Sequence, residues 1–247
     1  MIFSHSRDLG DIVYSLCAMK AAGGGELHLR DDGPQFSAHG MTPARVAAIR
    51  PLLESQTYVT KVVYPSTERG DVDFGRAAWR MSPSRSIHDW YLCEAGADPT
   101  AILKPWLHTS PGVVPLRART VFIARSARRQ NPFFPWRGIV DLIRRKRVSV
   151  FFVGTPQEHT EFVAAHGHVS YLATPTLLDL ANVMWESCRC FIGNSSCPLA
   201  VAEGLKLPCI VEIDPTADRD IHLCRAQRWE SSGQCLDFEG ILDSLLL

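Results

Sequence analysis

Two polar segments of this chain have the residue types that bind a phosphate or a sugar. The first is the turn Gly193-Asn194-Ser195-Ser196, which directly follows the apolar stretch Cys190-Phe-Ile192. A helix that begins after such a turn directs unpaired N–H groups and the positive end of its dipole at it. The same residue types also cap helices without binding a ligand, and the turn alone leaves both functions open.

The second chemical candidate is a carboxylate near the N-terminus. Asp11 follows a strand candidate over residues 2–5 and starts a predicted helix over residues 11–22, which Gly23-Gly24-Gly25 ends. Open α/β sheets bind ligands just beyond the carboxyl ends of their strands, where a carboxylate can act as a general base. A helix-capping role, which contributes roughly 0.5 to 2 kcal/mol, remains the alternative for Asp11.

A basic segment supplies cations for a phosphate. Residues 117–147 hold ten Lys or Arg residues and one acid, Asp141. Arg125, Arg128 and Arg129 follow the apolar strand candidate 121–124, and this position favours diphosphate binding by at least one of them. The run Arg144–Arg147 ends a predicted helix, where solvated cations complement the helix dipole.

Strand and helix patterns alternate along the chain, which predicts an α/β protein. Strand candidates also occupy residues 27–29, 58–64 and 209–213, and a helix is expected over residues 44–49 with Pro51 starting a new turn. The prolines at 105, 111 and 115 indicate a linker, so we expect domains over residues 1–115 and 116–247.

The arrangement of these segments resembles the heptosyltransferase-like family of GT-B glycosyltransferases, which includes the ADP-heptose:lipopolysaccharide transferases. The matching segments are Leu9-Gly10-Asp11-Ile12, the loop 124–136 and the stretch 193–213. The resemblance implies a GT-B architecture, in which two Rossmann-like doubly wound domains face each other across a cleft that holds the site. At 247 residues the chain is short for this architecture, and we expect the N-terminal half to be the trimmed one.

The resemblance also implies a reaction, namely inverting, metal-independent transfer of a sugar from a nucleotide-diphosphate sugar to an acceptor hydroxyl. No cofactor is expected beyond this co-substrate. Asp11 is the implied general base, and Gly10, His88 and Asp89 are candidates on the acceptor side. The donor-binding candidates are Arg125, Ser126, Arg128, Arg129, Asn131, Gly193, Asn194, Ser195, Ser196 and Glu203.

Because of departures from the family pattern, the sequence does not identify the donor nucleotide or sugar. Ser195, Cys197 and Ala200 stand where the family has Asp, Gly and His. An Asn-Ser-Ser turn followed by Glu203 also resembles nucleotide-sugar 2-epimerases, in which such a Glu holds the ribose hydroxyls. A transferase, an epimerase or hydrolase, and a nucleotide-binding protein without catalysis therefore remain open. The resemblance implies a saccharide or glycolipid as the acceptor, and a hydroxymethylated DNA base of the kind that some phage enzymes glycosylate is the alternative.

Several simpler interpretations accompany these hypotheses. His88 and Asp89 also fit a capped helix that packs Trp90, and Asp71-Val72-Asp73 is expected in a surface loop and not at a metal. The eight cysteines have no zinc spacing or disulfide framework, and a net charge of zero indicates no global attraction to nucleic acid. The sequence contains no transmembrane segment or signal peptide, so we expect a cytoplasmic protein. The sequence does not indicate an oligomeric state.

Overall fold

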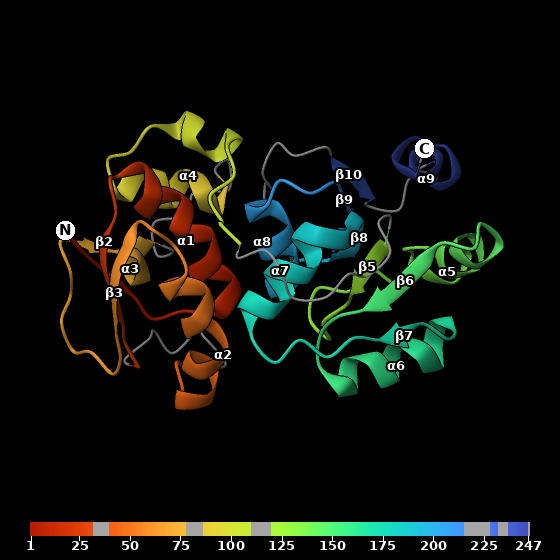
Figure 1. Cartoon of the computed structure of the whole chain (residues 1–247), viewed down its shortest axis with the longest axis horizontal. Coiled ribbons are helices and arrows are strands. Elements are labelled where there is room, and N and C mark those ends of the chain that lie inside the picture. Colours follow the sequence, from red (N-terminus) through yellow and green to blue (C-terminus); the bar gives the residue numbers. More distant parts are fainter. Residues whose placement is uncertain (32–39, 78–85, 110–119, 215–227, 232–236, 247) are drawn as a thin grey trace. The chain divides into compact units, whose positions relative to one another are not determined.

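The computed structural model describes residues 1–31, 40–77, 86–109, 120–214, 228–231 and 237–246 (Figure 1). The chain divides into two compact units. Unit 1 consists mainly of Met1–Ser110, and unit 2 contains most of the remaining chain. The predicted linker at Pro111 and Pro115, and with it the boundary after residue 115, lies outside the described residues.

Unit 1 is built on a parallel sheet with the strand order β3-β2-β1-β4. Its strands are β1 (Ile2–His5), β2 (Gly25–Leu29), β3 (Val59–Val63) and β4 (Val72–Asp73). Its helices are α1 (Leu9–Ala21), α2 (Pro43–Glu54), α3 (Phe74–Ala77), α4 (Ile87–Glu94) and the 3-10 helix η2 (Pro99–Leu103).

Helix α1 forms much of the core of unit 1. The predicted apolar face is confirmed, since Ile12, Val13, Leu16 and Met19 are fully buried. The helix begins after Asp8 and not at Asp11, and it ends where Gly23 and Gly24 adopt positive φ values of 93° and 80°. Glycine adopts this conformation without the penalty of a side chain, which makes it a common helix terminator.

Two local expectations in unit 1 are wrong. Helix α2 continues through Pro51 to Glu54, because Leu52 and Leu53 extend its buried face. Asp71-Val72-Asp73 is no surface loop: Val72 and Asp73 form β4 beside β1, and Asp71 Oδ2 accepts a hydrogen bond from Ile2 N at 2.8 Å. The hydrogen bond of Asp71 and the pairing of β4 with β1 give this segment a structural role.

Unit 2 contains a larger parallel sheet with the strand order β10-β9-β8-β5-β6-β7. The strands are β5 (Thr120–Ala124), β6 (Ser149–Phe152), β7 (Ser170–Tyr171), β8 (Cys188–Asn194), β9 (Cys209–Glu212) and β10 (Arg228–Ser231). The helices are α5 (Trp136–Arg145), α6 (Pro156–His166), α7 (Leu177–Ser187), α8 (Cys197–Gly204) and α9 (Phe238–Leu246).

The core of unit 2 lies between its sheet and the helices α5 and α6. Trp136 is at its centre, with its ring edge-on to Phe162 at a centroid distance of 5.1 Å. The strands β5 and β8 contribute Val121, Ile123 and Ile192, all fully buried. The apolar strands that the sequence indicates are therefore central strands with both faces covered.

Each sheet has a point at which the strand order reverses. In unit 2 the chain proceeds from β5 to β6 and β7 on one side, and later strands follow on the other side of β5, beginning with β8. In unit 1 the reversal lies between β1 and β4. Ligands of open α/β sheets bind beyond the carboxyl ends of the strands at such reversals. The predicted α/β class with Rossmann-like parallel sheets is confirmed.

Among the helices that the structure describes, none combines the length and the apolar character needed to cross a membrane. The described residues also contain no cluster of three or more His, Cys, Asp or Glu side chains with the geometry to hold a metal ion.

Candidate functional site

The two polar segments predicted for unit 2 meet at its strand reversal. Ala124, the last residue of β5, is the register partner of Gly193 in β8. The two backbones approach so closely that a Cβ atom on Gly193 would lie 2.5 Å from the carbonyl oxygen of Ala124. Only glycine permits this contact, and it brings the loop after β5 against the turn after β8.

Asn194 joins the loop and the turn through its side-chain amide, which is fully buried. Its Oδ1 atom accepts hydrogen bonds from Ser126 N at 3.0 Å and Ser126 Oγ at 3.3 Å. Its Nδ2 atom donates to the carbonyl oxygens of Ser126 at 3.0 Å and Arg128 at 2.8 Å. Asn194 therefore holds the backbone of the loop, and these bonds occupy the polar atoms that were predicted to touch a donor.

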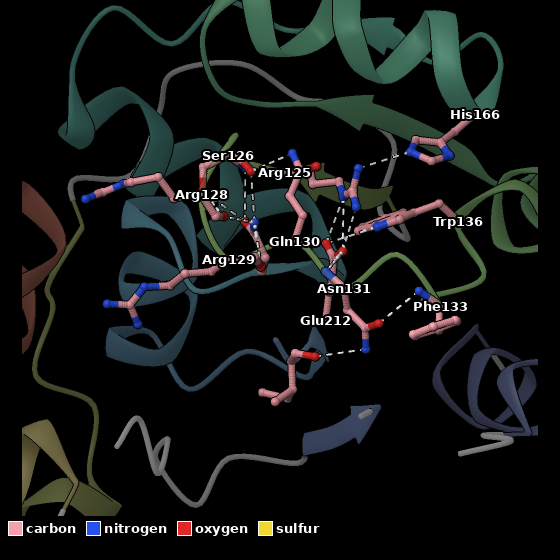
Figure 2. Close-up of polar contacts among 12 residues, drawn as sticks. Arg125, Ser126, Arg128, Arg129, Gln130, Asn131, Phe133, Trp136, His166 and Glu212 are labelled. Atoms are coloured by element: carbon pink, nitrogen blue, oxygen red, sulfur yellow. Dashed lines mark hydrogen bonds and ion pairs between the residues drawn. The ribbon is translucent and has the colours of Figure 1, made fainter. Parts of the chain in front are cut away.

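Arg125 is held in an ion pair with Glu212, the last residue of β9 (Figure 2). Its Nη2 atom donates to Glu212 Oε1 at 2.8 Å, and its Nε atom donates to Glu212 Oε2 at 2.9 Å. Its Nη1 atom lies 3.2 Å from His166 Nε2, which must accept because arginine has no acceptor. All three nitrogens of the guanidinium thus have a protein partner.

The histidine on Arg125 is neutral near pH 7. Burial, reinforced by the charges of Arg125 and Arg137, lowers the pKa of His166 below its usual value. A neutral ring with Nε2 as the acceptor carries its proton on Nδ1. His166 thus completes the hydrogen bonds of Arg125 without adding a competing charge.

Arg128 and Arg129 have a different position in the same loop. Figure 2 shows both side chains extending away from Glu212, on the opposite side of the loop from Trp136. Arg128 is exposed, and Arg129 is partly exposed with a φ of 59°. A left-handed backbone is unusual for arginine, and the carbonyl oxygens of both residues accept from Asn194 Nδ2. The loop conformation therefore sets the direction of these two cations.

The turn ahead of helix α8 offers hydroxyl groups. Ser196 is the N-cap residue of α8, but its Oγ atom donates to Asn194 O at 3.0 Å and does not cap the helix N–H groups. The Oγ atom of Ser195 is buried without a hydrogen-bond partner among the described residues. The helix thus lacks a side-chain cap, so the simple capping alternative is not what the structure shows for this turn.

Asn131 and Glu203 lie in the interior. Asn131 is 1% exposed, and its side chain donates to Ile213 O at 2.9 Å and accepts from Phe133 N at 2.9 Å. Glu203 on α8 is fully buried. Asn131 thereby supports the loop, and Glu203 presents no exposed carboxylate for the hydroxyls of a ribose.

Asp11 occupies the first turn of α1, beyond the carboxyl end of β1. Its Oδ2 atom lies 3.9 Å from Arg7 Nη1, and its side chain is 25% exposed. Gly10 precedes it within the helix. A partly exposed carboxylate is accessible to an acceptor hydroxyl, which a general base requires.

A buried histidine lies next to this turn. His5, the last residue of β1, is fully buried, and its Nδ1 atom accepts from Arg7 N at 3.2 Å. Burial, with a smaller contribution from Arg7, lowers the pKa of His5 to about 3. The ring is therefore neutral at physiological pH and helps to hold the backbone between β1 and Asp11.

The remaining acceptor-side candidates have structural partners. His88 is fully buried on α4, with its ring edge-on to Tyr14 at 4.5 Å and near Trp106 at 5.6 Å. Asp89 forms a capping box with Ser86 at the start of α4. The alternative of a capped helix that packs Trp90, which is 8% exposed, is therefore confirmed.

Glu212 is the residue that sequence reasoning missed. A charged residue in the apolar strand 209–213 was the available signal, since glutamate is rarely buried without a partner. The partner could not be identified, because Arg125 and Trp136 lie 87 and 76 residues away in the chain.

The fold is similar to solved structures of sugar transferases. The E. coli heptosyltransferase WaaC with ADP has 12% identity and a TM-score of 0.62, over 99% of this chain and 98% of that one. WaaC with ADP-2-deoxy-2-fluoro heptose has 11% identity and a TM-score of 0.58, over 93% and 92%. A glycosyl transferase of family 9 from Veillonella parvula has 12% identity and a TM-score of 0.63, over 99% and 88%.

These likenesses confirm the predicted resemblance at the level of the fold. No protein-family model matches the chain, and no curated protein matches it. The shared fold extends over nearly the whole chain although only about one residue in eight is identical.

Proposed function

We propose that this chain is a glycosyltransferase that moves a sugar from a nucleotide-diphosphate sugar to an acceptor hydroxyl. The observation that carries the proposal is the meeting of the arginine loop and the Asn-Ser-Ser turn at the strand reversal of unit 2. Cations, hydroxyl groups and the N-terminus of α8 gather at the edge where open α/β sheets bind ligands.

Unit 2 supplies the donor site in this proposal. Arg128 and Arg129 provide charge for the diphosphate, and Ser195 provides a hydroxyl without a described partner. Breaking the glycosidic bond leaves negative charge on the diphosphate, which positioned cations and N–H donors stabilise. This stabilisation does not require a metal, and we propose metal-independent transfer.

Unit 1 supplies the base. Asp11 would accept the proton of the acceptor hydroxyl as that oxygen attacks the anomeric carbon, with inversion of its configuration. The partial exposure of Asp11 and its proximity to Arg7 support this role. Its place beyond the carboxyl end of β1, beside the strand reversal of unit 1, supports it further.

Adenine nucleotides are the first donors to test. Two of the similar structures are described with ADP and with an ADP-heptose analogue. Ser195, Cys197 and Ala200 replace residues of the family pattern beside the proposed diphosphate site. The ADP-heptose specificity of the family is therefore not carried over, and the donor screen includes other sugars.

We propose a saccharide or glycolipid as the acceptor. The basic segment that would favour DNA is partly neutralised within unit 2, because Lys146 Nζ pairs with Asp243 at 2.6 Å and with Glu239 at 3.3 Å. Arg144 Nη1 also lies 3.7 Å from Asp141 Oδ1. Salt-sensitive retention of hydroxymethylated DNA by the full chain would favour the DNA acceptor instead.

A thermal-shift panel of nucleotides and nucleotide sugars tests the donor. A ligand at a hundredfold its Kd adds roughly 2.7 kcal/mol to the free energy of unfolding, which is a readily measured shift. The absence of a response to every nucleoside diphosphate would contradict the proposal.

A product assay separates the reaction classes. Release of the nucleoside diphosphate that depends on an added saccharide acceptor, and that persists in EDTA, is the expected result for metal-independent transfer. Release without any acceptor would indicate a hydrolase, and conversion of the sugar within the nucleotide sugar would indicate an epimerase.

A further inference from the structure

We propose that Glu212 is a positioning residue for the loop of residues 125–131, which we call the diphosphate loop. In this proposal Arg125 binds Glu212 and does not bind the ligand. The proposal rests on the proposed donor site and assigns its cations: Arg128 and Arg129 face the diphosphate, and Arg125 forms the internal support of the loop that carries them. Sequence reasoning treated the three arginines as equivalent, and the structure separates them.

The first argument is the completeness of the contacts around Glu212. This carboxylate is fully buried and accepts from Arg125 Nε and Nη2, from Asn131 N at 2.8 Å and from Trp136 Nε1 at 3.0 Å. Asn131 and Trp136 follow Arg125 along the loop and into α5. One carboxylate therefore binds the beginning of the loop, its end and the helix after it.

The second argument is the place of Glu212 in the sheet. Glu212 is the register partner of Asn194 on the neighbouring strand, and both residues end their strands at the same edge. Asn194 binds Ser126 and Arg128 in the first part of the loop. Glu212 thus holds the loop at Arg125 and at Asn131, and Asn194 binds the backbone of the segment between them that bears Arg128 and Arg129.

The third argument is electrostatic. A carboxylate close to a diphosphate site repels the ligand unless its charge is neutralised. Arg125 neutralises it, with a side chain that is only 12% exposed and has hydrogen bonds at every nitrogen. The pair contributes no net charge, so Glu212 can favour binding only through the geometry that it maintains.

This argument gives a test in which the two effects have opposite signs. Removing the charge of Glu212 should tighten binding of an anion if charge alone matters, and should weaken it if Glu212 positions the loop. The probe is the nucleoside diphosphate among ADP, UDP, GDP and CDP that the wild-type chain binds most tightly in calorimetry. We expect Glu212→Gln to raise its Kd about tenfold, which corresponds to roughly 1.4 kcal/mol.

Three comparisons complete the experiment. The exposed substitution Glu161→Gln on α6 removes the same charge from the same unit, and we expect a wild-type Kd. Arg125→Lys keeps a cation but loses the forked contact, and we expect a Kd increase similar to that of Glu212→Gln. The Kd of the double variant should be no higher than that of the single variant that binds more weakly, because the two substitutions remove the same interaction.

Salt dependence adds a readout that distinguishes support from contact. Arg128→Ala should make the Kd less sensitive to salt, since a direct charge contact is lost, whereas Glu212→Gln removes no cation and should not reduce this sensitivity. If Glu212→Gln does not fold, Trp136→Phe removes the Nε1 donor to Glu212 together with part of a buried ring. This variant should raise the Kd about twofold to threefold.

The outcomes separate this inference from the proposed function. A wild-type chain that binds none of the four nucleotides overturns both. A wild-type chain that binds a nucleotide, with a Glu212→Gln variant that binds it equally well or more tightly, overturns the positioning role alone. An unchanged Kd in Trp136→Phe, where that variant is the one measured, has the same consequence.

Discussion

The side-chain amide of Asn194 holds the backbone of Ser126 at both its N–H and its carbonyl group. Asn194 Oδ1 accepts from Ser126 N at 3.0 Å, and Asn194 Nδ2 donates to Ser126 O at 3.0 Å. The two residues are 68 positions apart in the sequence. This contact joins the loop after β5 to the turn after β8, and the proposed donor site depends on it.

Replacement of Asn194 by alanine should destabilise the contact between this loop and this turn. Asn194→Ala leaves the N–H of Ser126 and the carbonyl of Arg128 without their partner, so we expect a loss of about 2–3 kcal/mol in the free energy of unfolding. Urea denaturation followed by circular dichroism measures it. The exposed substitution Gln157→Ala on α6 is the control, and an Asn194→Ala variant as stable as this control would contradict the expectation.

Replacement of Arg128 or Arg129 by alanine should weaken donor binding. We expect each substitution to raise the Kd of the bound nucleoside diphosphate about tenfold, because a charge-assisted hydrogen bond contributes roughly 1.5–3 kcal/mol. The stability of Arg128→Ala should change by less than about 0.5 kcal/mol, since this side chain is exposed. Titration calorimetry gives the Kd, with exposed Arg145→Ala as the matched control. Equal effects at Arg128 and Arg145 would indicate a general effect of charge.

Replacement of the carboxylate of Asp11 should abolish transfer and preserve donor binding. Asp11→Asn keeps the shape of the side chain but cannot accept the proton, and positioned general bases contribute about 10²- to 10⁴-fold to a rate. We expect kcat to fall within this range while the Kd of the donor nucleotide stays unchanged. An Asp11→Asn variant with full transfer activity would show that another group is the base.

Replacement of Gly193 by alanine should destabilise unit 2. The added Cβ atom would lie 2.5 Å from Ala124 O and 2.7 Å from a ring carbon of Phe191. Two buried neighbours would have to move, and such overpacking costs about 1–3 kcal/mol. Thermal unfolding measures the change, and Gly138→Ala on α5, where an added Cβ meets nothing within 4 Å, is the control. A Gly193→Ala variant with the melting temperature of this control would contradict the expectation.

The stability of unit 1 should decline in acid because of His5. The pKa of its imidazole is lowered to about 3 in the folded chain, so below pH 6.5 the unfolded chain binds a proton that the folded chain does not. The free energy of unfolding should therefore fall between pH 6.5 and pH 3, by on the order of 4 kcal/mol from this group. Above pH 6.5 the ring is neutral in both states and contributes no pH dependence.

A His5→Asn variant isolates this effect from the titration of carboxylates. Asparagine keeps an acceptor for Arg7 N but loses the ring contacts with Phe74 and Tyr91, so the variant should be less stable at pH 7.5. The difference from the wild type should shrink as the pH falls to 4.5. A difference that stays constant over this interval in urea titrations would contradict the assignment to His5.

The alternation of apolar strands and amphipathic helices was sufficient to predict the α/β class and most elements. Local physical chemistry dominates there: apolar runs such as 121–124 become buried strands, and Gly23 and Gly24 end α1. Prediction failed at Pro51 and at Val72-Asp73, where burial of neighbouring residues and pairing with β1 override local turn signals. Such tertiary contacts leave no local trace in a sequence.

The candidate site divides in the same way. The amino-acid sequence was enough to identify the chemical groups that are available, namely a carboxylate at Asp11, an arginine-rich loop and an Asn-Ser-Ser turn. Which of these side chains bind other parts of the protein became clear only from the folded chain, because Glu212 and Asn194 reach the loop from strands that are distant in the sequence. A buried charge or amide must find partners within the fold, and these partners direct Arg125 inward while Arg128 remains exposed.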